Sequence, residues 1–324
     1  MGTDDSRGEN MAIGKKGVFY TLLAIVFILV LIFFVKIKTE SKLTDKIDLT
    51  RTRIDTMNNF VDAVEEDVER ALYISGFRSM LAFNQYLLKS NGTYLNSTQE
   101  AFQEAIFNGT VNGEEDALIS GSTFYDWVTN VREKGNNLNI ELQMNEPELA
   151  VYQTDPWHIK LDLNVTVVAQ DVKGMASWYR RSNIISTISI EGFEDPLYIV
   201  QTYGRYTNIV NRTIYEGNYT YEVTPGVWNV NNLKDHVTKM YYTENSDAPD
   251  FLMRFEGKLT DSPNGIESMI NLEKLNSQGI PVYQYSVVDH EYWSETSGRT
   301  VSGMQSWFRI DTGHETKYQV ESIS

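Results

Sequence analysis

Cysteine is absent from the 324 residues of this chain. Its absence excludes disulfide bonds, thiolate zinc sites and a cysteine nucleophile. A domain that works outside the cell without disulfides has to be stabilised by its hydrophobic core. Hydrophobic residues make up 41 % of the sequence, so a core of sufficient size is available.

Basic residues are scarce relative to acidic ones. The chain has 28 Lys and Arg against 44 Asp and Glu, which gives a formal net charge of −16. Residues 1–38 carry a small positive excess, so the remainder is even more acidic than the whole. Such a surface repels phosphate backbones, and we therefore expect no nucleic-acid partner.

Local signatures of catalysis are also missing. The sequence contains no G-x-S-x-G, no H-E-x-x-H, no phosphate-binding loop and no dinucleotide fingerprint. Its four histidines, His158, His236, His290 and His314, are not spaced to share a helix face as a metal-binding pair. In the stretch DHEYW (289–293), an extended backbone would point neighbouring side chains to opposite faces. We therefore expect no catalytic residue, no metal ligand and no cofactor, and an enzyme is the least favoured class.

One long apolar run, Val18 to Val35, contains no charged residue and no proline. As a helix rising 1.5 Å per residue it would span about 27 Å, which matches the hydrocarbon core of a bilayer. The residues that follow it offer no small-residue cleavage site. We therefore predict a retained transmembrane helix over 18–35, whose partner is the lipid bilayer.

Flanking charge does not decide the orientation of this helix, because basic residues lie close to it on both sides. Long domains, however, cross membranes largely regardless of such charges. We expect residues 1–17 to form a short cytosolic leader and the residues after 35 to lie outside the cell membrane. An outside location makes six N-x-T sequences candidate glycosylation sites: Asn91, Asn96, Asn108, Asn164, Asn211 and Asn218.

The sequence K-K-G (15–17) directly before the apolar helix resembles the leader of type IV pilin-like proteins, especially archaeal ones. In that family a prepilin peptidase cuts after the glycine on the cytosolic side. The resemblance therefore implies cleavage between Gly17 and Val18. Leu22 occupies the fifth mature position, where many pilins have glutamate. An uncleaved signal anchor is the alternative.

Two further segments carry a second resemblance. EGFEDPLY (191–198) and FLMRFEGKLTDSPNGIESMIN (251–271) are similar to segments of uncharacterised membrane-anchored surface proteins of archaea. This resemblance implies a location at the cell surface and brings no activity with it.

Residues 43–71 show a heptad pattern, in which apolar side chains recur every seven residues in two series. The first series is Ile47, Ile54, Val61 and Val68. The second is Leu43, Met57, Val64 and Ala71, with Thr50 as its one polar exception. We predict one long amphipathic helix over 36–90. It could be a stalk or coiled coil, a pilin-like continuation of the apolar helix, or a helix packed along the sheet of its own domain. The partners expected are further copies of the chain, through 43–71, or other surface proteins.

Residues 91–135 are predicted to be helical, because Ser97 with Glu100 and Thr123 with Asp126 mark two helix starts. From residue 138 on, apolar and polar residues alternate, which is typical of antiparallel strands with one solvated face. The strands expected are 138–143, 157–167, 184–190, 197–203, 212–222, 282–288, 305–311 and 315–321, with a helix over 231–242. We therefore predict an α+β fold with a β-rich extracellular head over 136–324.

The stretch ASWYRRS (176–182) holds the one compact basic and aromatic cluster of this acidic sequence: Trp178, Tyr179, Arg180 and Arg181. We treat it as a candidate contact patch for an acidic partner or for a neighbouring copy, with an ordinarily packed turn as the alternative.

The leading prediction is a single-pass, membrane-anchored cell-surface protein with a structural or interaction role, in its most specific form a pilin-like subunit. The alternative is an extracellular head of the sensor type that binds a ligand or a carbohydrate.

Overall fold

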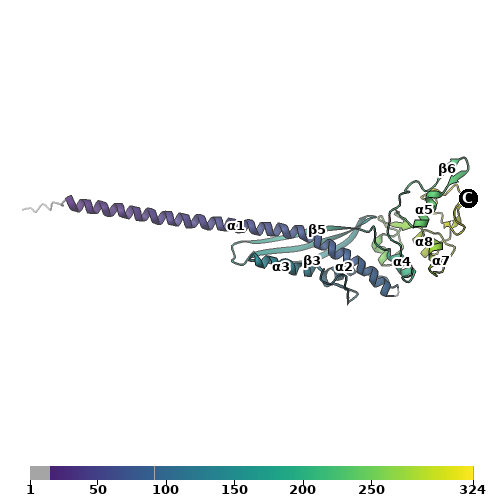
Figure 1. Cartoon of the computed structure of the whole chain (residues 1–324), viewed down its shortest axis with the longest axis horizontal. Helices are drawn as coiled ribbons and strands as arrows, with labels where there is room; N and C mark the ends of the chain where they lie inside the picture. The colour runs from purple at the N-terminus through teal and green to yellow at the C-terminus, as the bar shows by residue number, and fades with distance from the viewer. Residues whose placement is uncertain (1–14, 91, 324) are drawn as a thin grey trace, which may run out of the picture.

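The computed structural model describes residues 15–90 and 92–323, with side chains from residue 20 on except those of 21 and 41–45. The chain combines helices with antiparallel sheets, as the α+β prediction requires. Its first element is one continuous helix, α1 (Lys15–Lys89), of 75 residues. At 1.5 Å per residue this helix is about 110 Å long. Figure 1 shows its N-terminal part extending freely from the rest of the molecule.

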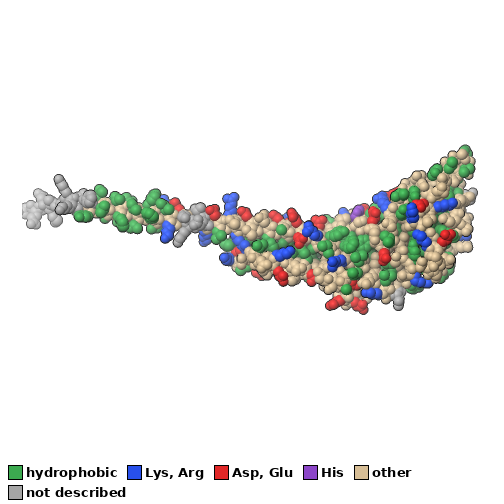
Figure 2. Space-filling view, in the orientation of Figure 1, with side chains coloured by type: hydrophobic (Ala, Val, Ile, Leu, Met, Phe, Trp, Pro, Cys, Tyr) green, Lys and Arg blue, Asp and Glu red, His purple; other side chains and the backbone are tan. Residues whose placement is uncertain are grey.

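The free part of α1 contains the apolar segment. Leu22–Glu40 is long and apolar enough to cross a membrane, and none of its side chains is buried within the chain. Figure 2 shows hydrophobic side chains along the visible side of this part of the helix, whereas acidic and basic side chains are spread over the visible face of the body. The apolar helix predicted from the sequence is therefore present, and it runs without a break into the amphipathic helix.

Arg53 already contacts the end of the sheet, and from Met57 on, α1 packs against the body of the protein with buried side chains. The buried residues include Met57, Val61, Val64 and Val68, which are the heptad positions of this stretch. Ile47 and Ile54 continue the same stripe toward the apolar segment but are 58 % and 39 % exposed. The second half of the heptad pattern therefore packs on the body of the same chain, whereas Ile47 and Ile54 of its first half are left exposed.

The sheet beneath α1 is a meander of three antiparallel strands in the order β3 (Ile140–Asp155), β4 (His158–Asp171) and β5 (Ser177–Ser189). Alternate residues of β4 from Ile159 to Ala169 are buried, and the residues between them mostly lie half exposed on the other face. The alternation predicted for the first three strands is therefore confirmed. Two helices, α2 (Thr98–Asn108) and α3 (Phe124–Asn137), pack into this core with α1, and the core continues into the later part of the chain through residues such as Phe251, Phe255 and Ile266.

Both predicted helix starts are confirmed. The Ser97 side chain accepts a hydrogen bond from the Glu100 amide at the start of α2. At the start of α3, Thr123 and Asp126 form a reciprocal capping box. The loop between these helices holds a short pair of strands, β1 (Thr110–Val111) and β2 (Glu114–Glu115).

Residues 190–323 form a second unit, which we call the distal lobe. It lies at the end of the molecule that is far from the apolar segment, and the C-terminus lies there too (Figure 1). Short elements separated by loops make up the lobe: α4 (Pro196–Gln201), β6 (Tyr221–Thr224), β7 (Val227–Asn229), α5 (Asn231–Lys239), β8 (Tyr242–Glu244), α6 (Phe251–Phe255), β9 (Ile266–Ser268), α7 (Leu272–Ser277), α8 (Asp289–Trp293), β10 (Arg299–Thr300) and β11 (Arg309–Ile310).

Several strands predicted in this lobe are wrong. Segment 197–203 is mostly helix α4, because Asp195 caps its first turn and Pro196 suits the first helical position. Segments 212–222 and 305–311 contribute only a few strand residues, and 282–288 and 315–321 form no strand. Their apolar residues fill the lobe's own cores from loops and turns. Short apolar alternation does not distinguish a strand from an irregular segment packed on two sides. The helix predicted over 231–242 is confirmed as α5, three residues shorter.

Candidate functional site

The predicted processing residues, Gly17 and Val18, lie in the first turn of α1, and their side chains lie outside the described set. Among the predicted glycosylation sites, Asn91 also lies outside the described residues. Four are exposed: Asn96, Asn108, Asn211 and Asn218. Asn164 is only half exposed, on the solvated face of β4, where its side-chain oxygen accepts a hydrogen bond from Asn183 at 3.1 Å.

The predicted contact patch lies on strand β5 and is not a turn. Tyr179 is 78 % exposed, whereas Trp178 packs partly against the core. Arg180 Nη1 lies 3.0 Å from Glu65 Oε2 of α1, and Arg181 Nη2 lies 3.1 Å from Glu148 Oε2 of β3. Both cations are thus paired with acids of the same chain, which weakens the case for an acidic partner at this surface.

The distal lobe contains a buried ionic cluster that the sequence did not reveal. Arg254 of α6 is completely buried, with Nη1 2.6 Å from Asp195 Oδ2 and 3.0 Å from Asp289 Oδ2. The Tyr242 hydroxyl donates to the same oxygen of Asp195 at 2.7 Å, and Ser268 donates to Asp289 at 2.8 Å. Burial raises the pKa of Asp289, but Arg254 and the neighbouring histidine outweigh burial and hold it well below its usual range. The cluster therefore joins α4, α6 and α8 through charge.

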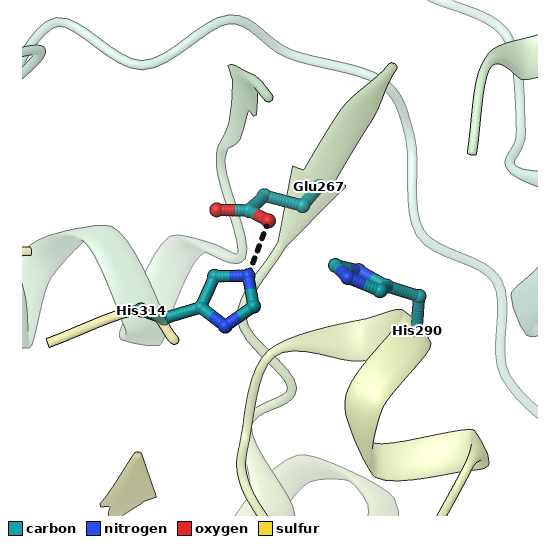
Figure 3. A group of neighbouring side chains, drawn as sticks. All are labelled: Glu267, His290 and His314. Carbon is teal, nitrogen blue, oxygen red and sulfur yellow. Dashed lines mark hydrogen bonds and ion pairs between the residues drawn. The ribbon is translucent and has the colours of Figure 1, made fainter. Parts of the chain in front are cut away.

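A second part of the cluster surrounds Glu267 of β9, which is fully buried. Its Oε2 lies 3.1 Å from His314 Nε2, and its Oε1 accepts a hydrogen bond from the Tyr318 hydroxyl at 2.8 Å. His314 Nδ1 lies 2.8 Å from Asp311 Oδ1. Burial lowers the pKa of His314, but these two carboxylates raise it to about 10 overall. Figure 3 shows Glu267 and His314 facing each other, with His290 beside them.

His290 completes the group from helix α8. Its side chain is buried, Nδ1 lies 3.4 Å from Asp289 Oδ1, and its ring centroid lies 5.4 Å from that of His314. Within the described part of the chain, His290 Nε2 has no hydrogen-bond partner. Glu267, His290 and His314 each place one possible metal-ligand atom in the same spot, and these three atoms lie within 4.8 Å of one another.

The extended backbone assumed for 289–293, with neighbouring side chains on opposite faces, is therefore wrong. This stretch is a short helix and not a strand, so that Asp289 and His290 are both buried on the side that faces β9 and the C-terminal segment. More than twenty residues separate Glu267 from His290, and His290 from His314, so local spacing carried no signal of their convergence.

Comparison of the chain with protein-family models, curated proteins and solved structures finds no match. Function therefore has to be inferred from the geometry of the chain itself.

Proposed function

We propose that the chain is a single-pass, membrane-anchored cell-surface protein with a structural role, in which α1 supplies both the anchor and a surface for assembly with neighbouring copies. The observation that carries this proposal is the continuity of α1. One uninterrupted helix begins in an uncovered apolar segment and ends in the core of the body.

The exposure of the apolar segment supports the anchor. Large side chains such as Phe27, Phe33 and Phe34 are about two-thirds exposed. Soluble proteins rarely leave a continuous apolar surface of this size in water. Insertion into a bilayer removes this surface from water and satisfies every backbone hydrogen bond within the helix.

The junction between helix and sheet supports a mechanical role. Arg53 ties α1 to the end of the sheet: Nε lies 2.5 Å from Asp171 Oδ1, and the two Nη atoms donate to the carbonyls of Leu138 and Asn139 at 2.7 and 2.6 Å. Only about 16 residues, or about 24 Å of helix, separate the apolar segment from Met57. The body is therefore held at a defined height and direction, as a display or filament subunit requires.

The uncovered stripe on this spacer supports assembly. Ile47 and Ile54 are one heptad apart and exposed, in line with heptad residues that are buried further along the helix. In an assembly, the same stripe of a neighbouring copy would cover them. A pilin-like subunit is the specific form of this proposal, and it rests on the resemblance of the leader.

Cysteine cross-linking tests the assembly surface on a cysteine-free background. Ile47→Cys and Ile54→Cys should form disulfide-linked dimers in native membranes under mild oxidation. Leu49→Cys is the matched control, because Leu49 is similarly exposed but lies about 200° around the helix from Ile47. If Leu49→Cys cross-links as efficiently as Ile47→Cys, or if neither does, the stripe is not the interface.

N-terminal sequencing of the membrane-extracted chain tests the pilin-like form. A start at Val18 supports processing after Gly17. A start at residue 1 or 2 would remove the pilin-like form and leave the simple anchor.

The alternative from the sequence is a sensor-type head that binds a ligand or a carbohydrate. Carbohydrate binding would need several exposed aromatic rings on one surface. The exposed rings Tyr179, Tyr203 and Tyr283 come from β5, from the loop after α4 and from the loop after α7. This alternative stays a prediction.

A further inference from the structure

Three buried side chains of the distal lobe have the composition of a metal site, and their ligand atoms lie within 4.8 Å of one another. Glu267 comes from β9, His290 from α8, and His314 from the turn after β11. Two ligands of a tetrahedral zinc ion lie about 3.3 Å apart when each metal–ligand bond is about 2.0–2.1 Å. The observed 3.1 Å between Glu267 Oε2 and His314 Nε2 is close to this value. Without an ion it is a hydrogen-bonding distance, and a bound ion would displace the proton from His314 Nε2.

The contacts behind the two imidazoles support the same assignment. Histidines that bind metals usually direct their other ring nitrogen at a carboxylate, which fixes the tautomer and the ring. His314 directs Nδ1 at Asp311 at 2.8 Å, and Ser286 in turn donates to Asp311 at 2.6 Å. His290 places Nδ1 3.4 Å from Asp289, which Arg254 holds in place. Both rings thus have an outer carboxylate.

The independent observation is the unpartnered nitrogen of His290. Its side chain is only 3 % exposed, yet Nε2 makes no hydrogen bond among the described residues. Glu291 Oε1, at 3.7 Å, is too far away to accept one. A buried polar atom of this kind needs a partner. Because Nδ1 is engaged by Asp289, Nε2 is the nitrogen left free for a metal ion.

We propose that Glu267 Oε2, His290 Nε2 and His314 Nε2 bind one divalent transition-metal ion that fastens the C-terminal segment to the distal lobe. Two imidazoles and one carboxylate suit zinc and its first-row neighbours, whereas calcium and magnesium prefer sites built from oxygen ligands. The fourth position of a tetrahedral ion would be taken by water. Lys317 Nζ lies 3.8 Å from Glu267 Oε1, the carboxylate oxygen that is not a proposed ligand. Asn245 Nδ2 donates to Glu267 Oε2 at 2.6 Å, and a bound ion would replace this contact.

The ion would serve the lobe as a cross-link. It joins three segments that follow one another at intervals of more than twenty residues, in a unit built from short elements and without disulfides. An ion that binds only the folded lobe raises its stability by mass action. The anchor and the spacer of α1 do not depend on this site, so the metal proposal and the proposed function can fail separately.

The first experiment measures metal content of the full-length chain, purified in detergent, stripped with EDTA and then dialysed against excess zinc. Elemental analysis should find one zinc per chain. The unfolding temperature should fall after EDTA and return with zinc. Cobalt substitution should give the visible absorption of a tetrahedral site. If the chain holds no zinc and EDTA leaves the unfolding temperature unchanged, the cluster is a hydrogen-bonded ion network and the proposal is wrong.

Variants locate the ion. His290→Gln should lose the bound zinc or weaken its binding at least tenfold, and its unfolding temperature should no longer respond to EDTA. His158→Gln is the matched control, because His158 is half exposed on the solvated face of β4. Zinc bound equally by wild type and a folded His290→Gln would place the metal elsewhere and overturn the assignment. If His290→Gln does not fold, the wild-type zinc and cobalt measurements decide the matter.

Discussion

Gly76 of α1 offers a sharp test of how the long helix packs on the sheet. A Cβ at this position would overlap Leu161 Cδ1 of β4 and lie 2.8 Å from Ile188 Cδ1 of β5. Both side chains are completely buried. Glycine at Gly76 therefore lets α1 approach the sheet more closely than any other residue would.

We expect Gly76→Ala to destabilise the body, although the same change usually stabilises an exposed helix by about 1 kcal/mol. Inserting a methyl group into a packed core typically costs about 1–3 kcal/mol. The net loss should be about 1–2 kcal/mol, which lowers the unfolding temperature of a domain of this size by about 2–8 °C. Tryptophan fluorescence during heating of the detergent-solubilised chain measures it.

Two controls separate packing from helix propensity. Ala63→Gly changes an exposed position of the same helix and should cost about 1 kcal/mol through propensity alone. Leu161→Ala costs about 2–5 kcal/mol by itself, but it should cost at least about 1 kcal/mol less in the Gly76→Ala background, because the new methyl group fills part of the cavity. A Gly76→Ala chain that melts at a higher temperature than wild type would refute the reasoning.

Three further outcomes are expected. A chain with both Phe27→Lys and Leu31→Lys should pass into the soluble fraction on alkaline carbonate extraction, because each lysine in the hydrocarbon core of the bilayer costs about 2.5–3.5 kcal/mol. Ile47→Lys lies outside the apolar segment and should stay in the membrane fraction. Burial lowers the pKa of His236 to about 4 from an ordinary value near 6.5, so between these values the unfolded chain binds a proton that the folded chain does not. The free energy of unfolding should therefore fall as the pH drops from about 7 to about 4. Urea titrations of His236→Gln should show a weaker fall. Arg180→Ala breaks a partly exposed ion pair with Glu65 and should change the unfolding free energy by less than about 1 kcal/mol; a larger loss would mean that the contact patch is structurally important.

Much of helix α1 and of the three-stranded sheet could be predicted from the sequence. The apolar run, the heptads, the two capping pairs and the alternation of β4 each depend on residues within a few positions of one another. Helix and strand periods are local properties, so they appear directly in the order of residues. The expectation of an α+β chain with antiparallel strands follows from the same patterns and is confirmed.

The distal lobe was predicted poorly for a physical reason. Its elements are short, and many of its core residues come from turns and loops. Apolar residues in such segments are spaced by the surfaces that they meet, and these surfaces are far away in the sequence. The stretch 289–293 illustrates this, because His290 is buried beside Glu267 and His314, whereas Tyr292 is buried in a separate hydrophobic cluster.

The sequence by itself determined a long apolar helix, its amphipathic continuation and a solvated antiparallel sheet, because periodicity and capping act over three or four residues. Only the tertiary structure decided which heptad residues are covered by the body and which are left exposed, and it alone brought Glu267, His290 and His314 together. The meeting of distant carboxylate and imidazole groups depends on how the whole chain closes, and no local pattern encodes that closure.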